Sequence, residues 1–179
     1  KDKDVSLVLK KIKIKLDLKN LNFFLAANKP IVKYKNTKLD FSEIKIYFKV
    51  ISILKSKPEL VKLIVDTQEI ELNELQKILI KAKPSNFKSF ALNNIYGGYI
   101  NSLLVIDFNK DLAVNDFNIT GKIKNTNIKI KDKVNTKEVN FSFSANKNSV
   151  SINLLKANFN EIKIENGTID VIKNKKLFV

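Results

Sequence analysis

Hydrophobic and charged residues alternate along much of this chain. The run Lys11–Leu18 reads KIKIKLDL, with apolar residues at every second position. Because successive side chains of a strand point to opposite faces, the run predicts a strand with one apolar and one charged face. The same alternation of apolar and polar residues occurs at Glu43–Phe48, Asn127–Lys131 and Glu161–Glu165.

The first part of the chain predicts strands whose apolar phase slips. The expected strands are Val5–Leu25, Ile31–Tyr34, Lys38–Phe48 and Leu60–Leu72, with a turn at Asn28–Pro30 and a hairpin-like Asn36-Thr37. The phase shifts by one residue at Lys19-Asn20, between Phe41 and Ile44, and between Val65 and Ile70. A β-bulge at Lys19-Asn20 keeps the apolar residues of a continuous strand on one face.

Two segments have helical rather than alternating spacing. Val50–Lys57 suits one or two turns that end before Pro58. Asn73–Lys83 has a helical apolar stripe, with Asn73 as the expected N-cap and Pro84 as the stop. The stretch Pro84–Asn94 has the composition of a loop and suggests a boundary between two halves.

The remainder of the chain predicts strands joined by short polar turns. The expected strands are Tyr99–Asn109, Leu112–Ile130, Glu138–Ala145, Val150–Phe159, Glu161–Glu165 and Thr168–Ile172. The expected turns are Asn109–Asp111, Lys131–Asn135, Asn146–Asn148 and the hairpin dipeptide Asn166-Gly167. Gly97-Gly98 lacks a phosphate-loop fingerprint and indicates a strand kink.

Successive strands with short turns favour a mainly β fold: an elongated, twisted antiparallel sheet, a meander or trough, with one or two short helices. We expect an N-terminal β-rich unit over residues 1–86 and a C-terminal β-repeat unit over 87–179, joined in one continuous sheet. The chain begins without Met and stops on apolar residues, so we also expect it to be a fragment of a longer protein.

The high positive net charge of the chain can be interpreted in two ways. The net charge is +15, which is typical of proteins that meet nucleic acid or anionic membranes. However, every basic residue is Lys, and Asn, Ile and Phe are abundant, which is the composition that an AT-rich genome produces. The absence of Arg also removes the bidentate fork that phosphates and guanine edges favour.

The composition argues against catalysis. The chain has no Cys and no His, so zinc sites and Ser-His or Cys-His pairs cannot be built from it. Carboxylates gather at Glu69–Glu74 and at Asp107–Asp116, on a strand face and around a turn, where solvated acids are ordinary. We therefore expect no catalytic residue, no metal site and no cofactor.

Rows of lysine and many phenylalanines raise the hypothesis of a nucleic-acid-binding module. Stacking on bases needs aromatics on the same face as the cations. At Lys11–Leu18 and Asn140–Ala145 the apolar and polar faces are instead segregated, which disfavours this hypothesis.

Three stretches resemble the AsmA-like family of bacterial envelope proteins, relatives of the bridge-type lipid transporters. They are Asp17–Tyr34 (DLKNLNFFLAANKPIVKY), Leu39–Leu72 (a strand, short helix and strand unit) and Leu92–Ile130, where Gly98, Gly121 and Ile123 fall at matching places. Asn166–Val171 (NGTIDV) resembles the start of another repeat.

The resemblance implies a curled sheet with an apolar lining, located in the periplasm and anchored in the inner membrane by a segment not present in this chain. It also implies phospholipid or another amphiphile and bacterial membranes as partners, a role in outer-membrane lipid homeostasis, and no catalytic residues.

Our first hypothesis is a segment that holds or conducts lipid along an apolar β-trough. The alternatives are the basic nucleic-acid-binding module and a structural or adhesive β-protein whose apolar faces close into a sealed sandwich. The residues expected to line the trough are Ile12, Ile14, Leu16, Leu18, Ile44, Ile46, Phe48, Leu63, Val65, Ile123, Ile128 and Ile130.

Overall fold

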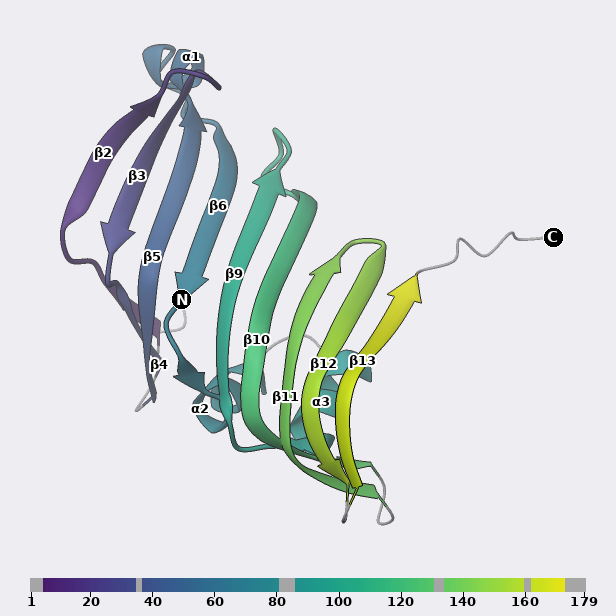
Figure 1. Ribbon diagram of the computed structural model, residues 1–179. Coiled ribbons are helices and arrows are strands. Elements are labelled where there is room, and N and C mark those ends of the chain that lie inside the picture. Colours follow the sequence, from purple (N-terminus) through teal and green to yellow (C-terminus); the bar gives the residue numbers. More distant parts are fainter. Residues whose placement is uncertain (1–4, 35–36, 81–85, 131–133, 160–161, 173–179) are drawn as a thin grey trace.

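The alternating segments pair side by side into one large antiparallel sheet that does not close on itself (Figure 1). A computed structural model describes residues 5–34, 37–80, 86–130, 134–159 and 162–172 of the chain. The sheet has 13 strands and follows the order β1-β4-β5-β6-β9-β10-β11-β12-β13. Off this path, β2 pairs with β3, β3 with β5, β7 with β9, and β8 with β10. The predicted fold class is confirmed.

The elements have the following bounds. The strands are β1 (Val5–Val8), β2 (Ile12–Asp17), β3 (Asn22–Asn28), β4 (Ile31–Tyr34), β5 (Thr37–Lys49), β6 (Leu60–Thr67), β7 (Ile70–Glu71), β8 (Ile95–Tyr96), β9 (Tyr99–Phe108), β10 (Val114–Ile130), β11 (Val134–Asn146), β12 (Ser149–Phe159) and β13 (Ile162–Ile172). The helices in the described residues are α1 (Val50–Leu54), α2 (Leu72–Leu79) and α3 (Asn86–Asn94).

The long strand β5 holds the N-terminal part of the sheet together. Its first residues pair with β4, and its later residues pair with β3. The change of partner falls at a register shift between Phe41 and Glu43 against β6, where the sequence predicts a phase slip. The extra residue there keeps Phe41 on the same face as Ile44, so the apolar phase survives the change of partner.

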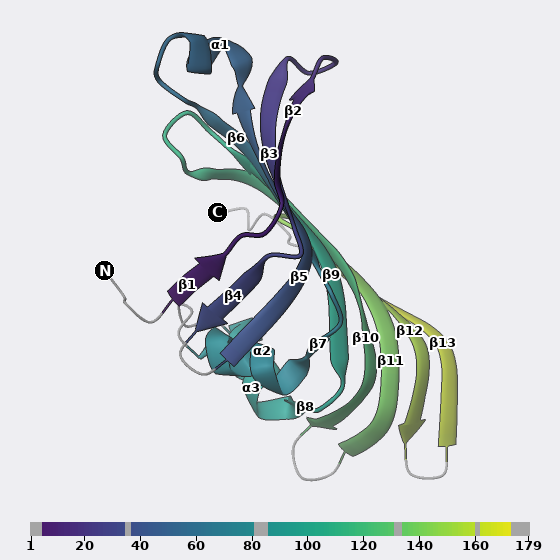
Figure 2. The same ribbon diagram turned by 90° about the vertical axis from the view of Figure 1, so that its left-hand side faces the viewer.

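Bulges bend the C-terminal strands at one level. Asn125, Glu138 and Asn166 have φ values of 53°, 52° and 59°, and they lie in β10, β11 and β13 of the strand order β10-β11-β12-β13. In β10 the apolar positions are odd-numbered up to Ile123, and the phase moves to even numbers from Thr126, with a register shift between those two residues. The bend therefore turns the strands without exchanging their faces (Figure 2).

The core lies at the end of the sheet where α2 packs on it. Figure 1 shows α2 and α3 at the lower end of the sheet. The buried residues of the core include Ile70, Ile100, Ile123 and Phe141, which face one another across β7, β9, β10 and β11. Leu75 and Ile78 of α2 pack against them. Figure 2 shows the two helices lying along one side of the lower strands, which curve around them.

Three strand predictions are wrong. Leu60–Leu72 is not one strand, because β6 ends at Thr67, β7 comprises only Ile70–Glu71, and Leu72 begins α2. Val5–Leu25 is not one strand with a bulge at Lys19-Asn20, because β2 and β3 form a hairpin there, with Asp17 opposite Asn22. Asn166-Gly167 is not a hairpin turn, because β13 runs through it as one strand from Ile162 to Ile172. A bulge and a tight turn both need a residue in the left-handed region, so the dipeptide alone does not separate them.

The helix predictions are confirmed in part. Helix α1 lies within Val50–Lys57, and α2 begins one residue before the expected start. Asn73 is not the N-cap, because Glu71 occupies that position without a side-chain hydrogen bond. The expected loop Pro84–Asn94 contains helix α3 from Asn86, and residues 81–85 lie outside the described residues.

The predicted turns and kinks are confirmed in part. The chain does not turn back at Asn28–Pro30, because β3 and β4 follow one another in the same direction along β5, with Asn28 opposite Glu43 and Ile31 opposite Asp40. Gly97 and Gly98 both have positive φ and separate β8 from β9. Chain reversals lie at Asn109–Asp111 and Asn146–Asn148. Of the other expected turns, Asn36 and residues 131–133 lie outside the described residues, whereas Thr37 already belongs to β5, and Val134 and Asn135 belong to β11. Strands from both expected units, 1–86 and 87–179, belong to the single sheet.

Candidate functional site

One row of side chains crosses nine strands of the sheet and is apolar throughout. Residues that pair directly across antiparallel strands lie on the same face. The row runs Ile12, Ala27, Ile44, Val65, Leu104, Ile119, Ala145, Val150 and Val171, from β2 to β13. We call the face that carries it the apolar face, and the opposite one the polar face.

A second apolar row runs beside the first, toward the upper end of the sheet. It comprises Ile14, Leu25, Ile46, Leu63, Ile106 and Phe117. Leu16, Phe23 and Phe48 form a shorter third row on the same face. The three rows make a continuous apolar surface over the upper half of the sheet.

The apolar face differs between its two halves. Its lower half is the core described above, where Ile100 and Ile123 are buried in a cluster that includes Leu72 of α2. Along the upper rows Ala27 is buried, the other inner residues are half-buried against their neighbours, and those on the outer strands are exposed: Ile14 by 67% and Val171 by 58%. Figure 2 shows α2 and α3 beside the lower strands and α1 beyond the upper end of β5.

The polar face has a different composition. The row Asn101, Lys122, Ser142, Asn153 and Thr168 is polar throughout. Lys62 there pairs with Asp107 at 3.3 Å, and Lys45 with Glu43 at 2.5 Å. The lysines of the alternating runs thus lie on the face opposite the apolar rows.

The polar face also carries apolar side chains, namely the row Ala26, Ile64 and Val105 beside Lys45, and one aromatic pair. Phe24 and Tyr47 stack there with ring centroids 4.8 Å apart, in the row that also holds Lys15 and Lys62. Aromatics and cations therefore share a face at this point, contrary to the segregation seen at Lys11–Leu18. The two rings stack on each other, which occupies one face of each.

The predicted lining residues fall into three groups. Ile12, Ile14 and Leu16 in β2, Ile44, Ile46 and Phe48 in β5, and Leu63 and Val65 in β6 all lie in the open rows. Ile123 and Ile128 share the apolar face but belong to the helix-covered half, where Ile123 is buried and Ile128 packs against the core. Leu18 follows β2 in a turn and is exposed, and the side chain of Ile130 lies outside the described residues.

Sequence reasoning missed about half of the open rows. The missed residues are Phe23, Leu25, Ala27, Leu104, Ile106, Phe117, Ile119, Ala145, Val150 and Val171. Their alternation was visible in the sequence, but their position opposite the predicted residues depends on strand order and register.

The upper rim of the sheet carries two exposed leucines, Leu21 and Leu112, each of which follows a lysine by two residues in the sequence. Leu21, in the β2–β3 turn, is 69% exposed and accepts a backbone hydrogen bond from Val50 of α1 at 3.2 Å. Leu112, in the β9–β10 turn, is also exposed. Both leucines have positive φ, 50° and 60°, a strained conformation for a bulky residue.

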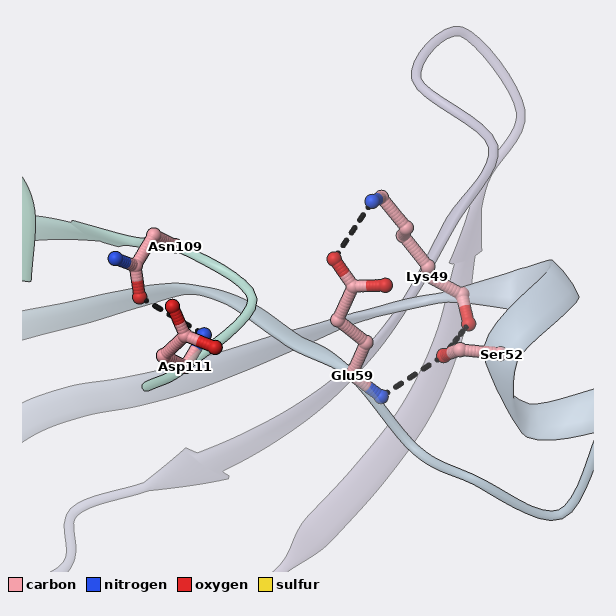
Figure 3. Close-up of polar contacts among 5 residues, drawn as sticks. All are labelled: Lys49, Ser52, Glu59, Asn109 and Asp111. Atoms are coloured by element: carbon pink, nitrogen blue, oxygen red, sulfur yellow. Dashed lines mark hydrogen bonds and ion pairs between the residues drawn. The ribbon is translucent and has the colours of Figure 1, made fainter. Parts of the chain in front are cut away.

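Polar side chains fix the connections of this rim (Figure 3). Ser52 donates to the carbonyl of Lys49 at 2.6 Å and accepts from the backbone N–H of Glu59 at 2.9 Å. The carboxylate of Glu59 pairs with the ammonium of Lys49 at 2.7 Å. In the β9–β10 turn, Asn109 Oδ1 accepts from the N–H of Asp111 at 3.0 Å.

The β2–β3 turn is closed by Asp17 and Asn20. The amide of Asn20 donates to Asp17 Oδ2 at 2.8 Å, and its backbone N–H donates to Oδ1 at 3.2 Å. These bonds favour the ionised carboxylate and lower the pKa of Asp17, with the side-chain bond as the largest cause. The bonds support the turn above the ordinary pKa of Asp, and this support is lost as the pH falls through the lowered value.

We therefore expect Asn20→Ala to raise the pKa of Asp17 toward its ordinary value. An NMR titration of the Asp17 carboxyl in both proteins measures the change, with the exposed Asp170 carboxyl as the internal control. An unchanged Asp17 titration contradicts the assigned cause.

Comparisons of the chain with protein-family models, with curated proteins and with solved structures find no match. In the described ranges, no helix has the length and hydrophobicity that crossing a membrane requires. The same residues contain no cluster of three or more Asp, Glu, His or Cys side chains arranged to hold a metal ion.

Proposed function

We propose that this chain is a non-enzymatic protein segment that holds or conducts a phospholipid or similar amphiphile along its apolar face. The nine-strand apolar row is the observation that carries the proposal. An acyl chain laid on that row removes apolar surface from water on both partners, at roughly 0.8 kcal/mol per buried CH₂ group.

The dimensions suit this ligand. Neighbouring strands lie about 4.8 Å apart, so nine strands span roughly 40 Å. A bilayer with two opposed layers of acyl chains has a hydrocarbon core about 30 Å thick, so one chain extends about 15 Å. The row is thus longer than one acyl chain and can take several in succession, as conduction along a trough requires.

The proposal also specifies where the lipid headgroups lie and where in the cell the segment works. Headgroups lie at the upper rim, where Lys19 and Lys110 flank the exposed leucines of the two turns and favour anionic lipids. In the setting that the AsmA-like resemblance implies, the segment works in the periplasm of a bacterial envelope and contributes to outer-membrane lipid homeostasis.

The test is lipid recovery and uptake. Native mass spectrometry of gently purified protein is expected to show bound phospholipid, and delipidated protein is expected to take up a fluorescent phospholipid. Lipid-free preparations that also fail to take up the probe overturn the proposal.

A basic nucleic-acid-binding module is the second candidate, favoured by the Phe24–Tyr47 stack beside Lys15 and Lys62. It predicts affinity for single-stranded nucleic acid that falls steeply with salt, because cations released from phosphates drive such binding. Fluorescence anisotropy with a labelled oligonucleotide at about 50 mM salt measures it. No binding under that condition removes this candidate.

A further inference from the structure

The last strand of the sheet leaves one edge open. β13 pairs with β12 on one side, and within the described ranges no strand pairs with its other side, which we call the outer edge of β13. All of its residues except Gly167 are exposed. The N–H and C=O groups of such an edge accept a further strand.

The bend at Asn166 restricts which strand fits the outer edge of β13. β12 follows β13 through the bend in one unbroken register, from Ser149 opposite Ile172 to Phe159 opposite Ile162. It does so because it has an extra residue of its own at that level: Leu155 is skipped in the pairing with β11. A strand without such a residue exchanges its faces on one side of the bend.

A second β13 has the required extra residue at the same level, namely Asn166. When two copies run antiparallel with Asn166 of each opposite Gly167 of the other, Ile164 meets Ile169 and Ile162 meets Val171. All four lie on the apolar face, because they pair with Ala157, Ile152, Phe159 and Val150 of β12. The bend and the apolar phase of the two copies therefore match in one register.

The same register matches the charges. Lys163 of each copy lies opposite Asp170 of the other, on the polar face, and the pair occurs twice by symmetry. Within one chain neither residue faces an opposite charge across β12, because Lys163 lies opposite Asn158 and Asp170 opposite Ser151. Opposite charges directly across antiparallel strands stabilise the pairing.

We infer that two copies of this chain associate through the outer edge of β13, about a two-fold axis that passes between Asn166 and Gly167. The axis is perpendicular to the sheet, so the apolar faces of both copies lie on the same side and form one longer surface. The inference does not depend on what that surface binds.

Charge exchange tests the register. Sedimentation equilibrium of the 179-residue chain is expected to show a monomer–dimer equilibrium. Lys163→Glu and Asp170→Lys each place like charges opposite one another twice, and each is expected to weaken the dimer about tenfold. The double variant exchanges the charges and is expected to restore it. Lys122→Glu, on the polar face of β10, is the control that leaves dimerisation unchanged.

Cross-linking tests the geometry independently. The chain has no Cys, so Glu165→Cys combined with Thr168→Cys introduces the only thiols. In the inferred register the thiol at position 165 of one copy lies opposite the thiol at position 168 of the other. Mild oxidation is therefore expected to give a covalent dimer. Thr120→Cys combined with Lys122→Cys is expected to give none.

A monomer at every concentration overturns the inference. So does a dimer that ignores the charge variants and does not cross-link, which points instead to stacking of the two apolar faces or to another contact. Both outcomes leave the lipid-uptake test unaffected.

Discussion

Gly98→Ala is expected to destabilise the protein by about 3 kcal/mol or more, one of the largest losses for a single methyl group in this chain. Gly98 has a φ of +83°, and a Cβ there lies 2.5 Å from the carbonyl oxygen of Lys124 and 2.9 Å from the backbone of Thr126. These atoms are main chain in β10, so the clash is relieved only when β9 and β10 separate.

The position also ties a helix to the sheet. The backbone N–H of Leu72, at the start of α2, donates to the carbonyl of Gly98 at 3.0 Å. Thr126, which is fully buried, lies against Gly98 and donates to the carbonyl of Tyr96 at 3.2 Å. A backbone shift at Gly98 therefore disturbs both the bend of the sheet and the attachment of α2 to the sheet.

Gly97→Ala is the matched control. Gly97 has a φ of +62°, but nothing lies within 4 Å of its added Cβ. Only the left-handed backbone cost applies, about 1 kcal/mol. Urea unfolding of both variants, followed by circular dichroism, measures the difference. Equal losses in the two variants contradict the assigned clash.

The sequence predicts the kind of fold because alternation is a local property. Ile12, Ile14 and Leu16 are apolar at every second position whatever strand lies beside them, and the slip between Phe41 and Ile44 falls at the observed bulge. The wrong predictions concern features that are decided by strands distant in the sequence. Whether Asn20 or Asn166 closes a turn or bends a strand is decided by the strand that pairs with it, which local sequence does not contain.

The candidate site, too, could be predicted from the sequence only in part. The sequence placed Ile123 and Ile46 in one lining, and both do lie on the apolar face. The difference between them comes from α2, which packs on the core that holds Ile123 and leaves Ile46 in the open rows. Helix α3, whose Ala91 carbonyl accepts a hydrogen bond from Gln76 of α2, falls in a stretch whose composition predicts a loop. Strand periodicity assigns a residue to a face, but it does not reveal what packs on that face.

Ile46→Glu is expected to abolish most lipid uptake. Ile46 lies in the middle of the second apolar row, between Leu25 of β3 and Leu63 of β6. An acyl chain on that row would bury the introduced carboxylate, and a charge taken out of water without a partner costs several kcal/mol. We therefore expect the affinity for a fluorescent phospholipid to fall by at least about tenfold.

Ile64→Glu is the matched control on the opposite face. Ile64 lies in β6, half-buried on the polar face, where Lys45 of β5 pairs directly with it. The same substitution there meets a lysine and is expected to leave uptake within about twofold of the parent. Circular dichroism and urea unfolding of both variants confirm that the sheet is intact before uptake is compared.

Lowering the pH distinguishes the effect of the introduced charge on lipid uptake from the effect of the changed side-chain shape. Near pH 4 a glutamate begins to lose its charge, since its ordinary pKa is about 4.3 and contact with an acyl chain raises it further. Uptake by the Ile46→Glu variant is therefore expected to recover in part as the pH is lowered, while the parent changes little. Equal losses for Ile46→Glu and Ile64→Glu, or none for either, contradict the assignment of the apolar face as the binding surface.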